Sequence, residues 1–146
     1  MKSLMNLVVG VLLVSVNFLF VGCNNADDNN IVDVNPKMEI NNVNLERKWI
    51  AAHFAFSQEC QPSKRSAYQK SSIEISIDGE RFHAIDQYSL KEQKGSWDLN
   101  GKVIKAILDE GGEKEYRIVE LKKNELIVQP INHKDLIEIE LVSFDK

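Results

Sequence analysis

Two cysteines and three histidines carry the widest range of chemistry in this chain: Cys23, Cys60, His53, His83 and His133. A thiolate beside an imidazole can act as a nucleophile with its base, and the same two groups bind zinc. Zinc ligands usually include a pair two to four residues apart, and no two of Cys60 and the three histidines are that close. His53 and His83 can still meet across paired strands, which leaves a metal site open as an alternative to histidines on strand surfaces or in loops.

The rest of the sequence contains no pattern that indicates catalysis. Seven glycines, mostly at expected turns, leave no material for a phosphate-binding loop. No local signature frames Cys60, and no local motif pairs two carboxylates for acid and base work. We therefore expect a protein that is not an enzyme and that binds no metal and no cofactor.

Cys23 stands at the end of an apolar N-terminal segment. Lys2 provides a positive charge, and the mostly apolar residues from Leu7 to Val21 match the length of a signal-peptide core rather than that of a membrane span. Gly22 is small enough to let a peptidase reach the bond before Cys23. An ordinary secretory leader with an incidental cysteine and an uncleaved anchor are the alternatives.

The four residues Phe20-Val21-Gly22-Cys23 resemble a bacterial lipobox, with Phe20 at the position where leucine is usual. The resemblance implies that a signal peptide of residues 1–22 is removed and that Cys23 carries fatty acyl chains such as palmitate. Two or more such chains hold a protein durably on a membrane. We therefore expect a lipoprotein of the cell envelope that is anchored in the outer membrane.

Residues 23–44 are expected to comprise the lipidated cysteine and a flexible tether. Eight of the residues from 24 to 44 are asparagine, which favours turns over helix or sheet, and Pro36 interrupts local regularity. The stretch Asn24-Asn25-Ala26-Asp27-Asp28 also resembles the acidic export signal of surface lipoproteins of Bacteroidota, and a merely solvated aspartate pair is the alternative. The sequence leaves open whether the domain faces the periplasm or the cell exterior.

The length and net charge of the chain limit the number of domains and the kinds of partner that we expect. Removal of residues 1–22 leaves 124 residues, enough for one domain, with 17 basic against 22 acidic side chains and a net charge of −5. Nucleic acid binding requires a concentrated basic patch, so we expect no nucleic acid partner. With Cys23 lipidated, Cys60 has no partner for an intrachain disulfide and is either buried or available to another protein.

Alternating apolar and polar residues dominate from Leu45 onward and predict β-strands. Asp78-Gly79 and Asn100-Gly101 suit tight hairpin turns. Residues 45–146 are therefore predicted to form an all-β, eight-stranded antiparallel up-and-down barrel, with an open sheet as the alternative. No long helix is expected, and residues 58–70 are interpreted as a loop that is either functional or mobile. The eight candidate strands lie near residues 46–57, 71–78, 80–88, 91–99, 102–109, 113–121, 124–131 and 135–144.

Several motifs resemble the lipocalin-like lipoproteins of Bacteroidota, over residues 45–142. Arg47 departs from the family pattern, because glycine is common at its position. The resemblance implies a barrel that holds one small apolar molecule in its mouth, and the META-type barrels of bacterial envelope proteins are a second possibility. The motifs are Leu45-Glu46-Arg47-Lys48-Trp49, Gly95-Ser96-Trp97 ahead of Asn100-Gly101, and residues 116–121 with 125–128.

Two interpretations of the barrel interior follow. A filled interior would leave only a small cavity near one end, and it would favour a structural, interaction or inhibitor lipoprotein that binds another envelope protein through residues 58–70. A ligand pocket would instead use aromatic side chains at the open end, which are otherwise core residues. Trp49 is expected to plug the closed end. The residues expected to point inward are Ile73, Ile75, Ile77, Ile104, Ala106, Leu108, Ile137, Ile139 and Leu141. The candidate ligand contacts are Phe54, Phe56, Phe82, Tyr88, Trp97 and Tyr116.

Overall fold

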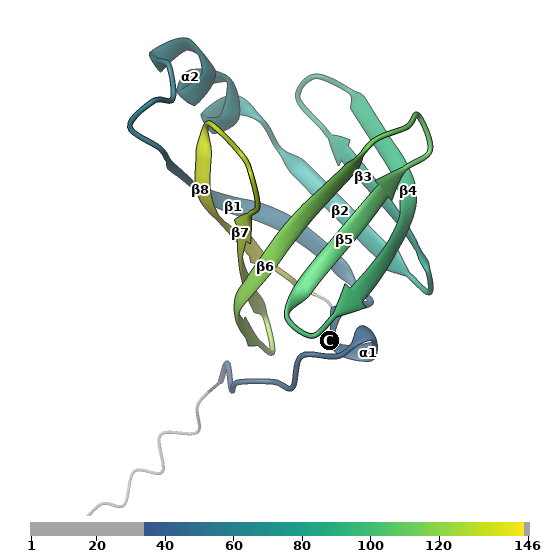
Figure 1. Ribbon diagram of the computed structural model, residues 1–146. Helices are drawn as coiled ribbons and strands as arrows, with labels where there is room; N and C mark the ends of the chain where they lie inside the picture. The colour runs from purple at the N-terminus through teal and green to yellow at the C-terminus, as the bar shows by residue number, and fades with distance from the viewer. Residues whose placement is uncertain (1–33, 145–146) are drawn as a thin grey trace, which may run out of the picture. The chain divides into compact units, whose positions relative to one another are not determined.

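The computed structural model describes residues 34–144, which form a closed antiparallel barrel (Figure 1). Each strand pairs with the next one along the chain and the last pairs with the first, so the predicted eight-stranded up-and-down barrel is confirmed. Every strand begins and ends within two residues of the predicted bounds. The strands are β1 (Lys48–Phe56), β2 (Ile73–Asp78), β3 (Arg81–Asp86), β4 (Lys91–Asn100), β5 (Val103–Leu108), β6 (Glu113–Lys122), β7 (Glu125–Pro130) and β8 (Leu136–Val142). The predicted signal peptide and Cys23 lie outside the described residues.

The alternation of side chains explains how the strands face. On β2, Ile73, Ile75 and Ile77 line the interior, as expected from their spacing of two. Glu74 lies between them on the outer face, where its carboxylate is 2.7 Å from the Lys48 ammonium of β1. The strand therefore reads apolar inside and charged outside, which fixes its register in the sheet.

Two β-bulges interrupt this alternation of inward and outward side chains where β1 pairs with β8. Ala51 is opposite Leu141 and His53 is opposite Glu140, so Ala52 is an extra residue on β1. A second shift, next to Phe56, makes Ile137 the extra residue on β8. The prediction that Ile137 points inward is therefore wrong: its side chain is 52% exposed. The other eight residues expected inside line the interior.

The connection from β1 to β2 contains a helix, α2 (Pro62–Lys70), where a loop was expected. Pro62 stands in its first turn, and the Ser71 amide ends it by donating to the carbonyls of Ala67 and Tyr68. None of its residues is fully buried, and its sequence has no apolar stripe, which is why periodicity did not predict it. Within residues 34–144, no helix is both long enough and apolar enough to cross a membrane.

Residues 35–45, here called the N-terminal strap, close one end of the barrel. The Met38 amide donates to the Leu121 carbonyl (2.9 Å), and Asn35 Oδ1 accepts from the Asn124 amide (2.8 Å). The strap ends in the short helix α1 (Asn42–Leu45), whose Leu45 is completely buried. The tether was expected to run to residue 44, but residues 35–45 already pack against the barrel. The strap binds through backbone and side chains alike, and its apolar residues Met38, Ile40 and Leu45 are too few among the asparagines to show a periodic pattern in the sequence.

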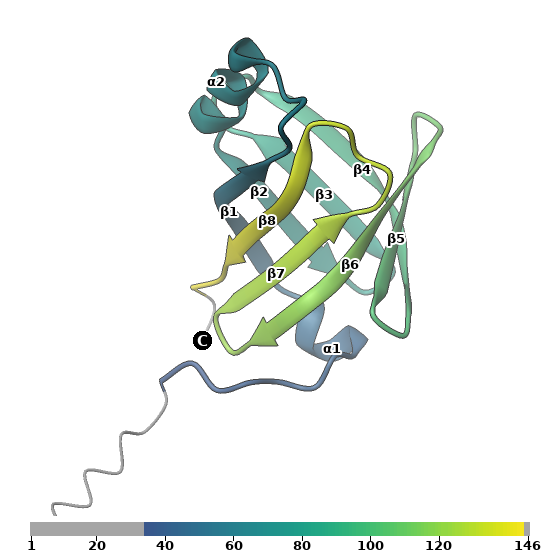
Figure 2. The same cartoon turned by 60° about the vertical axis from the view of Figure 1, so that its left-hand side comes forward.

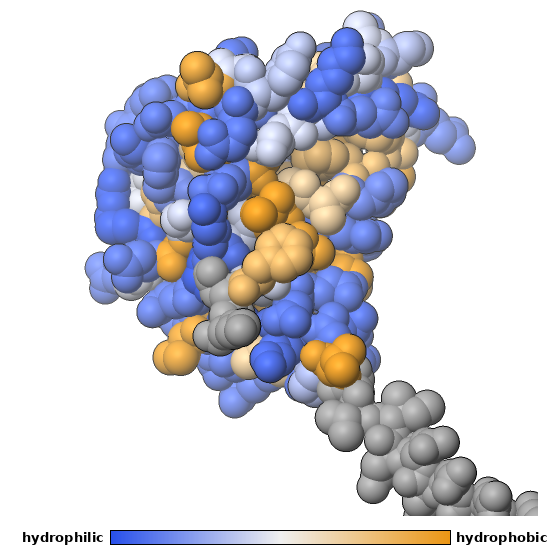
Figure 3. All heavy atoms as spheres, turned by 180° about the vertical axis from the view of Figure 1, so that it is seen from behind, coloured by the Kyte–Doolittle hydropathy of each residue, from blue (hydrophilic) through white to orange (hydrophobic). Residues whose placement is uncertain are grey.

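The two helices mark opposite ends of the barrel. α1 and the end of β8 lie at the end with the β2–β3, β4–β5 and β6–β7 turns, while α2 lies at the other end (Figures 1 and 2). We call these the closed end and the open end. On the face seen in Figure 3, hydrophilic residues cover most of the outer surface and apolar residues form a band across it.

Candidate ligand-binding cavity

A cavity of about 500 Å³ occupies the barrel interior. It reaches from Trp49 near the closed end to the β7–β8 connection at the open end, where Asn132 and His133 border it. The volume lies within the range of about 300–1,000 Å³ that is typical of small-molecule sites. The aliphatic interior therefore does not fill the barrel, contrary to the expectation of a small cavity near one end.

Small inward-facing residues explain the hollow. Ala51, Ala84 and Ala106 all line the cavity, while Gly95 on β4 has a different role. A Cβ added to Gly95 would lie 2.0 Å from the Ile107 carbonyl oxygen and 2.8 Å from Cε1 of Phe82. Glycine thus permits β4 and β5 to approach closely and lets a Phe82 ring cover the strand from inside.

The floor of the cavity is tightly packed around Trp49. Its side chain is completely buried, and its indole Nε1–H donates to the Leu45 carbonyl (3.0 Å). The Arg47 guanidinium carbon lies 5.4 Å from the centre of the Trp49 rings, a cation–π contact. Ile118 and Leu126 complete this core. Trp49 therefore lies in the floor at the closed end, where the sequence placed it, while its inner face borders the cavity.

Four of the six aromatic residues named from the sequence line the cavity: Phe54, Phe82, Trp97 and Tyr116. Trp97 is held in the wall by its Nε1–H, which donates to the Gly79 carbonyl (2.7 Å). The other two do not line it.

Phe56 and Tyr88 lie elsewhere at the open end. Phe56 lies beside α2, with its ring centre 5.9 Å from that of Tyr68. Tyr88 stands in the β3–β4 turn with 70% of its side chain exposed. Neither is therefore positioned to contact a ligand inside the barrel.

Tyr68 borders the cavity and was missed by the sequence analysis. Its ring centre lies 5.5 Å from that of Phe54, which joins α2 to the cavity wall. The connection was read as a loop, so no face could be assigned to Tyr68. Pro62 at a helix start, followed by eight residues without a β-branched side chain, was the available signal.

Lys114 is a second missed residue, at the open end of the cavity. Its ammonium donates to Gln93 Oε1 at 2.9 Å. Much of its side chain stays accessible, as expected for a residue bordering an open cavity, but nearby protein atoms shield it from water and lower the pKa of Lys114. Burial also raises the pKa of Tyr116, and the nearby Tyr68 adds to the rise. The cavity therefore pairs apolar walls with a polar mouth.

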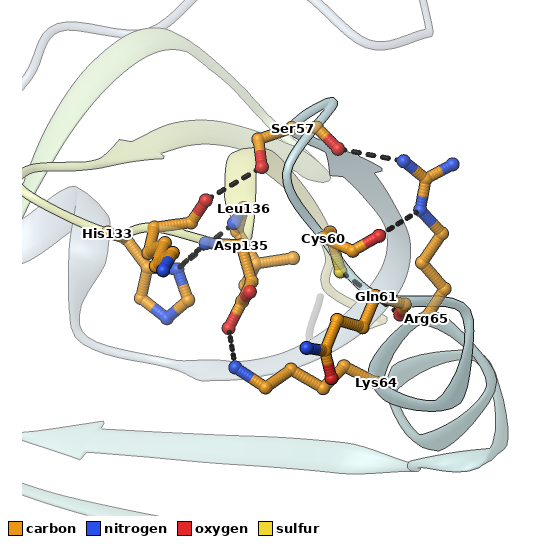
Figure 4. Close-up of polar contacts among 9 residues, drawn as sticks. Ser57, Cys60, Gln61, Lys64, Arg65, His133, Asp135 and Leu136 are labelled. Carbon is orange, nitrogen blue, oxygen red and sulfur yellow. Dashed lines mark hydrogen bonds and ion pairs between the residues drawn. The ribbon is translucent and has the colours of Figure 1, made fainter.

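Polar contacts hold α2 against the β7–β8 connection (Figure 4). The Lys64 ammonium lies 2.7 Å from the Asp135 carboxylate, and this hydrogen bond raises the pKa of Lys64. The Arg65 guanidinium donates to the carbonyls of Ser57 (2.8 Å) and Cys60 (3.1 Å). We call these contacts the α2 latch.

Cys60 is packed inside this arrangement and the histidines are dispersed. The Cys60 side chain is only 4% exposed, which resolves the two alternatives in favour of burial. His53 lies on β1 and His83 on β3, with β2 between them, and His133 accepts the Asp135 and Leu136 amides through Nδ1 (Figure 4). In residues 34–144, no group of three or more His, Cys, Asp or Glu side chains could hold a metal ion.

Comparisons with protein families, with curated proteins and with solved structures find no match for this chain.

Proposed function

We propose that this protein is a lipid-anchored lipoprotein of the bacterial outer membrane that holds or carries a small apolar ligand. The observation that supports binding is the cavity of about 500 Å³ with apolar walls and one polar mouth. The lipid anchor on Cys23 and the outer-membrane location rest on the resemblance of residues 20–23 to a lipobox. The resemblance of residues 45–142 to lipocalin-like lipoproteins points to the same function.

The cavity walls supply the driving force for such binding. Each methylene that leaves water for the cavity contributes about 0.8 kcal/mol. A flexible chain with several methylenes can therefore offset the free energy lost when a ligand is immobilised. The aromatic rings of Phe54, Phe82 and Trp97 add rigid surface at little cost in conformational entropy.

The alternative function, an interaction or inhibitor protein that binds an envelope partner through residues 58–70, drew on a filled barrel. The hollow interior removes that argument. The latch further turns Lys64 and Arg65 toward the barrel, so these side chains are engaged within the protein (Figure 4). We therefore favour the ligand-binding proposal.

Intrinsic fluorescence provides a direct test, because the chain has two tryptophans and both border the cavity. We expect titration of detergent-free protein with the uncharged dye Nile red to change tryptophan emission saturably, with one site per chain. Native mass spectrometry of protein isolated from the envelope, before and after denaturation, would then give the mass of any ligand that is already bound.

A matched pair of variants locates the site. Ala84→Phe adds a ring inside the cavity, whereas Ala67→Phe adds the same ring on the exposed side of α2. We expect Ala84→Phe to weaken dye binding at least ten-fold and Ala67→Phe to leave it unchanged. Equal binding by both variants, or no saturable binding by the parent protein, would contradict the proposal.

A further inference from the structure

The direction of Lys114 is set by strand register. On β6, Tyr116 is opposite Ile104 and Lys114 is opposite Ala106, and both of these β5 residues line the cavity. Residues two apart on a strand share a face, so Lys114 and Tyr116 both point inward. The Lys114 ammonium therefore lies at the mouth of an apolar cavity, where nearby protein atoms partly shield it from water.

Two other lysines of the open half of the barrel have carboxylate partners, whereas no ion pair is found for Lys114 within residues 34–144. Lys64 pairs with Asp135, and Lys105 pairs with Glu113 on the outer face. Glu115 also borders the mouth, and it lies opposite Lys105 in the sheet. Within residues 34–144, the one polar partner of the Lys114 ammonium is the neutral amide of Gln93.

Glu113, Glu115, Asn132 and His133 also border the cavity, and three further polar groups at the mouth can donate hydrogen bonds. The hydroxyls of Tyr68 and Tyr116 both border the cavity, and neither makes a hydrogen bond to another described residue. Gln93 directs its oxygen to Lys114, which leaves its amide N–H groups for another acceptor. An anionic oxygen group is the natural complement of an ammonium surrounded by such donors.

We propose that the cavity binds a single-chain amphiphile whose anionic oxygen headgroup, a carboxylate in the simplest case, contacts Lys114 at the mouth while its alkyl chain extends toward Trp49. This inference rests on the proposed ligand-binding function and names its ligand class. Lys114 then selects the headgroup, and the apolar walls hold the chain. The ligand anion supplies the counter-charge that the protein itself does not provide.

Three ligands of equal chain length test the headgroup: decanoic acid, 1-decanol and decylamine, each titrated at pH 7.5 with tryptophan fluorescence as readout. We expect the parent protein to bind the acid about ten-fold more tightly than the alcohol and to bind the amine most weakly, as a charge-assisted hydrogen bond predicts. Lys114→Met keeps the length of the side chain and removes its charge, so the acid should lose this advantage.

Two further variants make the result specific. Lys94→Met removes a charge on the outer face of β4, where Lys94 pairs with Glu92, and should leave all three affinities unchanged. Lys114→Arg keeps the charge and should keep the preference for the acid, even if Lys114→Met proves poorly folded.

Equal affinity for acid and alcohol in the parent protein would overturn the headgroup inference and leave the ligand-binding function standing. Retention of the acid preference in a folded Lys114→Met protein would overturn it as well. Failure of all three ligands and of Nile red to bind would instead refute the proposed function, and this inference with it.

Discussion

The two ends of the barrel are held by different forces. At the closed end, Leu45 and Trp49 are completely buried and the strap hydrogen-bonds along the β6–β7 turn. At the open end, α2 has no fully buried residue and is held by the latch, whose Lys64–Asp135 pair lies at the surface. Burial of large apolar side chains stabilises by several kcal/mol, whereas exposed ion pairs contribute little. The closed end of the barrel is therefore rigid, whereas rearrangement of the open end costs little free energy.

Removal of the central residue of the closed end should have the largest effect. Trp49→Ala deletes a buried ring and its bond to the Leu45 carbonyl, so we expect the free energy of unfolding to fall by about 3–5 kcal/mol. Urea denaturation followed by circular dichroism measures this change without relying on tryptophan emission. A loss below about 1 kcal/mol would mean that the closed end is not rigid.

Substitution of Gly95, in the middle of the barrel, should lower the free energy of unfolding nearly as much. Gly95→Ala forces a Cβ against the Ile107 carbonyl and the Phe82 ring, which we expect to cost about 3 kcal/mol. Gly79→Ala is the matched control, because a Cβ there meets nothing within 4 Å and only its positive φ of +53° is unfavourable, at about 1 kcal/mol. Equal costs in urea denaturation would refute the role assigned to this close approach.

A change at the open end should affect stability less. Tyr68→Ala removes the ring contacts with Phe54 and Phe56, which we expect to cost about 1 kcal/mol. Because Tyr68 borders the mouth, the same variant should release Nile red faster in stopped-flow displacement. A loss of stability as large as that of Trp49→Ala would remove the distinction between the ends.

The smallest effect should be a dependence of the open end on pH. Asp86 accepts hydrogen bonds from Ser89 Oγ and from the amides of Ser72 and Tyr88, and these contacts lower its pKa below the ordinary 3.8. Because the folded pKa is depressed, this contribution is fully present above pH 3.8 and is lost as the pH falls through the folded pKa.

Hydrogen exchange can measure this effect at single amides. On acidification through this window, we expect the protection factor of the Ser72 amide to fall while that of the Ile118 amide, bonded to the Lys102 carbonyl, stays constant. Asp86→Asn should remove the pH dependence at Ser72. Parallel loss of protection at both amides would indicate that the ends do not open independently.

The strands and turns were predictable because their signals are local. Alternation placed Ile73, Ile75 and Ile77 on the inner face, and Asp78-Gly79 placed the turn, where Gly79 has a positive φ of 53°. The prediction that Ile137 points inward failed because a bulge depends on how two strands pair, and the sequence of one strand does not reveal it.

The cavity and its polar mouth were less predictable for the same reason. Residue sizes suggested a filled barrel, but the space depends on where Ala51, Ala84 and Ala106 meet around the interior. Lys114 stands between Glu113 and Glu115, and such a run of charges is typical of a solvated face. Only its register opposite Ala106 shows that it faces inward.

The strap also limits how far the barrel can lie from the proposed lipid anchor. With Cys23 as the proposed anchor, residues 24–34 lie between the acyl chains and the strap in the sequence, and eleven residues span at most about 35–40 Å when fully extended. The chain enters the barrel at the closed end, opposite the mouth. Within residues 34–144, no residue of the strap lines the cavity, so attachment at the closed end leaves the mouth uncovered by the strap.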